Sequence, residues 1–127
     1  RVDASGRPRE MHTSLALDAI NFSIDSNNLT RPESELNRTV LLAESQYFQT
    51  SLITFDRPII KDYSLTDSFV IYICTESMAV IECNGHREEI KAGDTVLIPA
   101  SADSVAIIPS GKAALLEIFV PQKQTVK

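Results

Sequence analysis

Residues 69–100 read FVIYICTESMAVIECNGHREEIKAGDTVLIPA, and this stretch decides the fold. Its first segment, Phe69–Cys74, is a nearly continuous apolar run of β-branched and aromatic residues, which predicts a strand buried on both faces. A tight turn leads into a second apolar segment, Met78–Cys83. The Asn84-Gly85 dipeptide then predicts a two-residue hairpin, because both residues tolerate a positive φ, and the chain returns as a strand over His86–Ile90.

The same pattern continues on both sides of this stretch. Apolar segments at Thr95–Ile98, Val105–Ile108 and Ala114–Val120 predict further strands, and Tyr47–Asp56 alternates imperfectly before them. In total about seven or eight short strands, at a spacing of about ten residues, predict an all-β sandwich or barrel from Thr39 onward. We favour a jelly-roll barrel, because closure protects strand edges, while a seven-stranded immunoglobulin-like sandwich stays open as the alternative.

The first part of the chain has a different character. Residues 1–38 predict a loop, a short helix over Leu15–Phe22 and a long polar connection, with Thr13 or Ser14 capping the helix. Residues 39–127 are then expected to form the jelly roll, and the whole to behave as one domain. The fold class that the sequence predicts is therefore all-β with a short N-terminal helix.

Composition excludes several classes of function. The chain has 17 acidic and 12 basic residues and a net charge of −5, so the sequence predicts no nucleic-acid partner. No apolar run approaches the roughly 20 residues that cross a bilayer, so we expect no membrane partner. Cys74 and Cys83 lie in apolar segments and predict free thiols, and the first twelve residues do not resemble a signal peptide. A cytoplasmic location is the expectation.

The chain offers few groups for catalysis or metal binding. Its two histidines, His12 and His86, lie in different segments, and a lone His86-x-Glu88 is a weak metal signal beside the simpler reading of an exposed strand residue. Cysteines in apolar strands are usually inert. From the residues alone we therefore expect no catalytic residue and no metal ligand in this chain.

The richest polar cluster is Arg7–His12. Arg9 could bind a phosphate or carboxylate through both of its terminal nitrogens. The simpler alternative is a solvated turn, in which Glu10 favours the start of the following helix. The residues themselves favour this second reading.

Two parts of the chain resemble a known family. GRPREMH at residues 6–12 and LALDAI at residues 15–20 resemble the Gly-Lys-Pro-Arg-Glu-Leu-His and Ala-Leu-Asp-Val-Ile segment of type I mannose-6-phosphate isomerases of the bacterial short form. GDTVLIPA at residues 93–100, with Leu115–Glu117 downstream, resembles the last cupin strands of the same enzymes. The resemblance runs from Arg1 to about Val120, and its first motif is the more specific.

The resemblance implies the C-terminal cupin lobe of a zinc-dependent aldose–ketose isomerase, which interconverts mannose 6-phosphate and fructose 6-phosphate. The family's zinc ligands belong to an N-terminal catalytic lobe, and the resemblance implies that they would precede Arg1. Tyr72, Cys74 and Glu76 stand here where cupin ligands are expected, so we expect a metal-free jelly roll that needs its catalytic lobe as a partner and is inactive alone.

Within that reading, Arg9, Glu10 and His12 are the residues expected nearest the sugar phosphate substrate or the interface with the catalytic lobe. A lobe of this kind should also expose a large apolar patch, which could make the isolated chain a homodimer. The alternative function is a stand-alone, metal-free cupin module that binds a sugar or mediates dimerisation.

Overall fold

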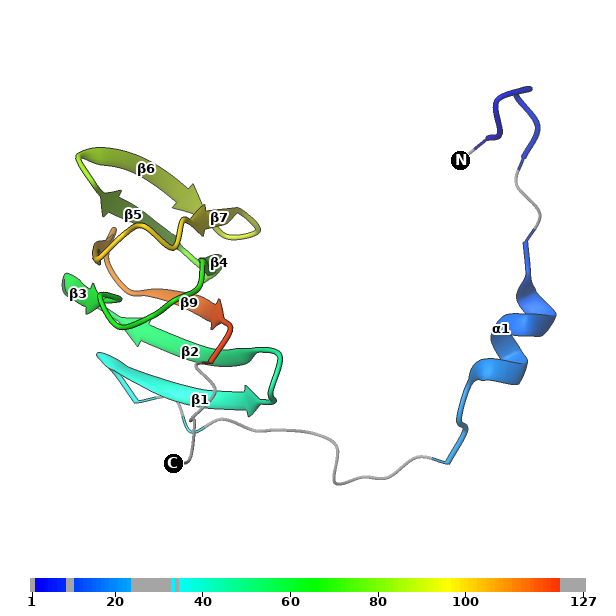
Figure 1. Ribbon diagram of the computed structural model, residues 1–127, viewed down its shortest axis with the longest axis horizontal. Helices are drawn as coiled ribbons and strands as arrows, with labels where there is room; N and C mark the ends of the chain where they lie inside the picture. The colour runs from blue at the N-terminus through cyan, green and yellow to red at the C-terminus, as the bar shows by residue number, and fades with distance from the viewer. Residues whose placement is uncertain (1, 9–10, 24–32, 34, 122–127) are drawn as a thin grey trace. The chain divides into compact units, whose positions relative to one another are not determined.

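The structure is a computed structural model that describes residues 2–8, 11–23, 33 and 35–121. The chain divides into two compact units, Arg1–Thr30 and Arg31–Lys127 (Figure 1). Most of the predicted polar connection lies outside the described residues. The predicted boundary between residues 38 and 39 lies at the start of the first strand, at Arg38.

The N-terminal unit contains the one helix of the described residues, α1 (Thr13–Ala19), whose seven residues are all unburied. The predicted cap is wrong, because the N-cap is His12 and no side chain caps the helix. The helix also ends earlier than predicted. Ile20 is extended, and the Asn21 side chain accepts a hydrogen bond from the Ser23 amide at 3.0 Å, a local turn that competes with continued helix.

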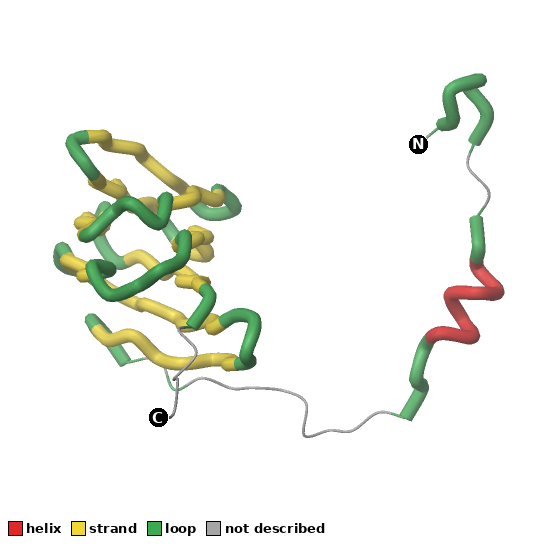
Figure 2. The backbone as a smooth tube through the Cα atoms, viewed as in Figure 1, coloured by secondary structure: helices red, strands yellow, loops and turns green. Residues whose placement is uncertain are grey.

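The second unit consists of two antiparallel sheets (Figure 2). The five-stranded sheet has the order β1-β2-β9-β4-β7, and the four-stranded sheet has the order β3-β8-β5-β6. The described residues thus contain nine strands: β1 (Arg38–Glu44), β2 (Gln49–Phe55), β3 (Ile59–Asp62), β4 (Val70–Glu76), β5 (Met78–Cys83), β6 (His86–Lys91), β7 (Thr95–Ile98), β8 (Ser104–Pro109) and β9 (Ala113–Phe119).

The strands pair in a nested order that defines the topology. β5 pairs with β6, β4 with β7, β3 with β8, and β2 with β9, so the chain folds back on itself as one long rolled hairpin. This nesting is a jelly roll, and it excludes the immunoglobulin-like alternative, whose strands follow another order. The all-β jelly-roll prediction is confirmed, and β1 and β3 are the two strands for which the pattern named no segment.

The burial of strand β4 differs from the prediction. Val70, Tyr72 and Cys74 are buried, whereas Ile71 and Ile73 between them are only half-buried, so the prediction of two buried faces is wrong. The strand alternates because one face packs toward the four-stranded sheet. The tight turn after β4 then carries the chain into the other sheet, since β4 and β5 belong to different sheets.

The core lies between the inner faces of the two sheets. Alternate residues of each strand point inward, and their burial drives the sheets together by roughly 1.5–3 kcal/mol for each large side chain. The largest fully buried hydrophobic side chains are Tyr72, Phe55, Ile53, Ile107 and Leu115.

The predicted hairpin at Asn84-Gly85 is confirmed, with Cys83 paired to His86 across the turn. Both turn residues have positive φ, 49° and 78°, as a type I′ turn requires. We predict that Gly85→Ala lowers the free energy of unfolding by about 1 kcal/mol in urea denaturation, because a side chain is strained at this φ. An added Cβ meets no atom within 4 Å, so the cost is not steric crowding.

Asn84→Gly is the matched control for this turn. It leaves the positive φ accessible, and we expect it to change stability by about 0.5 kcal/mol or less. Equal stability of Gly85→Ala and the native chain would contradict the assigned turn.

Candidate functional site

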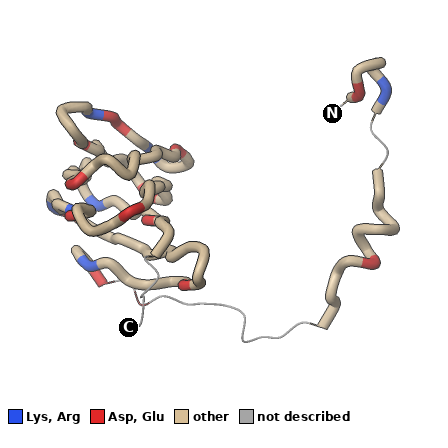
Figure 3. Tube along the Cα trace, in the orientation of Figure 1, with Lys and Arg blue, Asp and Glu red and all other residues tan. Residues whose placement is uncertain are grey.

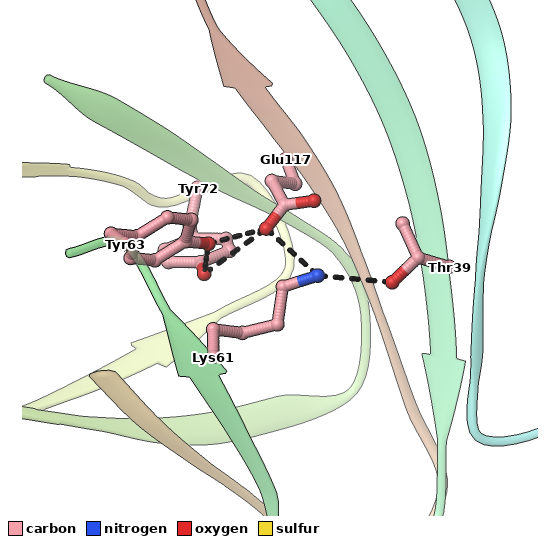
Figure 4. Close-up of polar contacts among 5 residues, drawn as sticks. All are labelled: Thr39, Lys61, Tyr63, Tyr72 and Glu117. Carbon is pink, nitrogen blue, oxygen red and sulfur yellow. Dashed lines mark hydrogen bonds and ion pairs between the residues drawn. The ribbon is translucent and has the colours of Figure 1, made fainter. Parts of the chain in front are cut away.

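A polar cluster lies inside the barrel, between otherwise apolar layers (Figure 4). Lys61 comes from β3, Tyr63 follows that strand, Tyr72 comes from β4, and Glu117 comes from β9. In the sheet register, Glu117 stands between Ser51 on β2 and Tyr72 on β4, so these three side chains share the inner face. Glu117 is 2% exposed and Tyr72 is fully buried.

The donors of the cluster converge on one oxygen atom, Glu117 Oε1. Lys61 Nζ lies 3.0 Å from it and also donates to Thr39 Oγ1 at 3.0 Å. The Tyr63 hydroxyl donates to the same carboxylate oxygen, and the Tyr72 hydroxyl makes a longer contact of 3.5 Å. The two tyrosine hydroxyls also hydrogen-bond to each other. The carboxylate is therefore paired and hydrogen-bonded, as a buried charge must be.

The environment keeps both tyrosines in their neutral form. Burial raises the pKa of Tyr63, and the neighbouring Tyr72 hydroxyl and Glu117 carboxylate raise it further. Burial and the Glu117 carboxylate likewise raise the pKa of Tyr72. Near neutral pH both phenols therefore keep their protons and act as hydrogen-bond donors. Their hydrogen bonds to Glu117 join β4 and the segment after β3 to β9.

The positions where cupin ligands are expected do not form a metal centre. Burial raises the pKa of the Cys74 thiol, and its Sγ donates to the Glu76 and Ser77 carbonyl oxygens at 3.6 and 3.5 Å. Tyr72 belongs to the buried cluster, and the Glu76 side chain is exposed. Within the part of the chain that the structure describes, no three His, Cys, Asp or Glu side chains gather closely enough to hold a metal ion.

A separate cleft of about 260 Å³ opens beside the β5–β6 hairpin and β7. Its apolar lining includes Ile81 and Ile98, and its polar lining includes Cys83, His86 and Glu88. His86 and Glu88 lie on the inner face of β6, since they alternate with the buried core residue Ile90. His86 is exposed, as the sequence predicts. Cys83 and Cys74 are both free thiols.

Of the residues that the sequence singled out, Tyr72 belongs to this cluster. Arg9 and Glu10 lie outside the described residues. His12 is exposed in the N-terminal unit, where its carbonyl accepts the Ala16 amide at 3.0 Å. The sequence did contain one signal for the cluster, because Glu117 is the only charged residue within the apolar strand AALLEIF. Lys61 was missed together with β3.

Solved structures with this fold share little sequence with the chain. A cupin superfamily protein from Desulfitobacterium hafniense has a TM-score of 0.58 and 23% identity, covering 71% of this chain and 84% of that one. KdgF from Halomonas sp. has a TM-score of 0.59 and 13% identity, covering 80% and 94%. An RmlC-like cupin from Shewanella frigidimarina has a TM-score of 0.58 and 16% identity, covering 82% and 95%. The chain therefore has the cupin-type jelly-roll fold.

No protein-family model matches the sequence, and no curated protein does. No helix among the described residues has the length and apolar character needed to span a membrane.

We predict that Lys61→Met lowers the free energy of unfolding by about 2–4 kcal/mol in urea denaturation, because it leaves the Glu117 carboxylate buried without its cation. Lys61→Met/Glu117→Gln should recover about 1–2 kcal/mol of that loss, since the uncompensated charge is removed.

The control for these two variants is Arg38→Gln, which breaks the Arg38–Glu35 ion pair. Both of these side chains are more than half exposed, so we expect a change within about 0.5 kcal/mol. A double variant that is no more stable than Lys61→Met would show that Glu117 is not a buried charge held by Lys61.

We also predict that stability falls with rising pH above about pH 10. Below the ordinary tyrosine pKa the folded and the unfolded chain both keep their phenol protons. Above that pKa the unfolded chain loses the phenol protons that Tyr63 and Tyr72 keep in the folded chain. Each buried tyrosine should contribute a slope that averages about −1 kcal/mol per pH unit, measured by urea denaturation between about pH 10 and pH 11, where the unfolded phenol ionises.

Tyr63→Phe and Tyr72→Phe should each reduce this slope, and Tyr47→Phe, which changes an exposed ring, should leave it unchanged. Identical slopes for all three variants would contradict the burial of the two phenols.

Proposed function

We propose that this chain is the C-terminal cupin lobe of a mannose-6-phosphate isomerase of the type I bacterial short form, and that it carries out no chemistry itself. The observation that carries this proposal is the barrel interior. In an enzyme with this fold the space between the sheets would have to admit a substrate and reactive groups, whereas here paired Glu117 and two neutral tyrosines fill part of it.

The residues at the expected ligand positions, Tyr72, Cys74 and Glu76, support a lobe without a metal of its own. Zinc binds thiolate, imidazole and carboxylate groups that converge on one point. Here the Cys74 thiol is buried with a raised pKa, Tyr72 is neutral, and Glu76 is exposed. These residues do not fit zinc, so the zinc of the proposed enzyme would belong to its catalytic lobe.

The N-terminal unit supports a role in contacting that lobe. Met11, Leu15 and Phe22 are 86%, 64% and 69% exposed, which is unusual for large apolar side chains in one short segment. The proposed contact residues Arg9, Glu10 and His12 belong to the same segment. In this proposal the unit packs on the catalytic lobe, and Arg9 or His12 lies near the sugar phosphate.

A second candidate function is a stand-alone, metal-free cupin module that binds a sugar. The cleft beside the β5–β6 hairpin favours it, because it combines apolar walls with the polar groups of Asn84, His86 and Glu88. Pockets for small ligands usually join a mainly apolar surface to a few polar groups in this way, although they are commonly larger, at about 300–1,000 Å³.

We predict that the purified 127-residue chain, with added zinc, does not convert mannose 6-phosphate to fructose 6-phosphate in a coupled assay. The reason is that the residues at the expected ligand positions do not form a zinc site. A full-length type I isomerase, assayed alongside, is the positive control. Turnover by the isolated chain that disappears on chelation of zinc would overturn the proposal.

The same sample separates the two candidates. Under the second candidate, titration with mannose or mannose 6-phosphate shifts the NMR signals of His86 and Ile98, and Glu88→Gln weakens binding. Under the first, neither sugar changes the spectrum, and the parent reading frame encodes Gln-x-His and Tyr-Arg-Val-Tyr-Asp motifs upstream of Arg1.

A further inference from the structure

The cleft beside the β5–β6 hairpin lies where two consecutive strands separate. β6 is the last strand of the four-stranded sheet and β7 is the last strand of the five-stranded sheet. Lys91 ends β6 and Thr95 begins β7, so a short turn joins two strands that enter different sheets. The cleft is lined by His86 at the start of β6 and by Ile98 at the end of β7, away from that turn. It therefore opens between two edge strands.

The two walls of the cleft differ in chemistry (Figure 3). β6 reads HREEIK and carries charges of both signs, whereas β7 reads TVLI and carries none. The apolar residues that line the cleft are Ile81, Val96, Leu97, Ile98 and Pro99. A ligand in the cleft would thus meet donor groups on the hairpin side and a water-excluding surface on the other side.

Cys83 and His86 stand opposite each other at the end of the hairpin. The register pairs them directly across the Asn84-Gly85 turn, so their side chains lie on the same face. That face is the inner one, because Cys83 alternates with the buried Ile81. Directly opposed residues have Cβ atoms about 4.5–5.5 Å apart. A thiol sulfur and an imidazole nitrogen can therefore point at one common position in the cleft.

Both donors are free to bind a ligand. Cys83 is a free thiol that is only partly buried, and His86 is exposed. Within the described residues, neither side chain makes a hydrogen bond or an ion pair. Cys74 differs in this respect, because it is buried and its Sγ donates to two backbone carbonyl oxygens.

We propose that Cys83 and His86 bind a soft monovalent metal ion of the copper(I) class. Soft thiolate ligands select copper(I), and imidazole also suits copper. Two donors in line are enough for a monovalent ion with a filled d shell, whereas zinc takes four ligands, or three protein ligands and a water. Among the described residues, no third His, Cys, Asp or Glu side chain completes such a group. The pair therefore fits copper(I) and does not fit zinc.

Charge selects the same class of ion. The Cys83 thiol releases its proton to solvent as the sulfur–metal bond forms, and neutral His86 contributes a nitrogen lone pair without losing a proton. A thiolate and a monovalent ion together carry no net charge, which suits the apolar wall, whereas a divalent ion would leave a positive charge there. Bonds of about 2.3 Å to sulfur and about 2.0 Å to nitrogen, as in zinc sites, put the two donor atoms about 4 Å apart, which opposed strand positions allow.

This inference does not depend on the proposed function, because the zinc of that proposal belongs to another lobe. It also differs from the second candidate function, which uses the same cleft for a sugar. The ion would be held by the thiol, whereas the sugar would be held by hydroxyl contacts that include Glu88.

The test is anaerobic competition for copper(I) between the full chain and the chelator bicinchoninate, with ascorbate as the reductant. We expect one tightly bound ion per chain. Cys83→Ser should abolish tight binding, and His86→Gln should weaken it by about tenfold or more. In a second measurement, silver(I) serves as a probe that does not change its oxidation state. It should shift the imidazole NMR signals of His86 and leave those of His12 in place.

The matched controls are Cys74→Ala and Glu88→Gln, and both should bind copper(I) like the native chain. Cys74→Ala removes the other thiol, and Glu88→Gln removes a hard ligand from the same face of β6. Circular dichroism and the urea midpoint report whether each variant stays folded.

A native chain that takes no copper(I) from the chelator overturns the proposal. His86→Gln that binds as tightly as the native chain also overturns it, because a thiol would then bind the ion alone. Preference for zinc over copper(I), with binding lost in Glu88→Gln, would show a site of another class.

Discussion

The buried carboxylate of Glu117 is the constraint around which the barrel is arranged. It lies on β9, a central strand of the five-stranded sheet, and only 2% of the residue is exposed. A carboxylate in this position costs several kcal/mol unless a cation and hydrogen-bond donors accompany it. Lys61 arrives from the four-stranded sheet and Tyr72 from the neighbouring strand, so one charge ties the two sheets together. The jelly roll is thus closed by polar contacts as well as by its apolar core.

This arrangement also determines the chemistry of the barrel interior. The donors that satisfy Glu117 lie between the two sheets, and the tyrosines remain neutral because burial disfavours their charged form. The cleft near His86 lies beside another part of the barrel, at the β5–β6 hairpin. The buried cluster and the cleft are therefore two separate sites in the barrel.

The surfaces of the chain differ in chemistry. The outer face of the five-stranded sheet has aliphatic rows that include Leu52 and Leu116, whereas the outer face of the four-stranded sheet combines the Glu82–Arg87 ion pair with exposed Ile60. The N-terminal unit supplies a third surface, with exposed Met11 and Leu15 beside the polar residues that resemble the isomerase motif. In the proposed function, this third surface is the one that would contact the catalytic lobe.

Local chemistry was enough to predict most strands, the Asn84-Gly85 hairpin and the jelly roll, because alternation and turn preferences act between near neighbours in the sequence. It named no segment for β1 or for β3, and the four residues of β3 are too short to show a period. It also ended α1 too late, because the Asn21 turn competes with the helix. The cluster around Glu117 was decided only by tertiary structure. Tyr63 and Glu117 stand 54 positions apart, and only the nested pairing of strands turns them toward the same point. The aliphatic row of Val40, Leu52, Leu116 and Ile73 on the outer face of the five-stranded sheet arises in the same way, since register determines which residues of separate strands become neighbours.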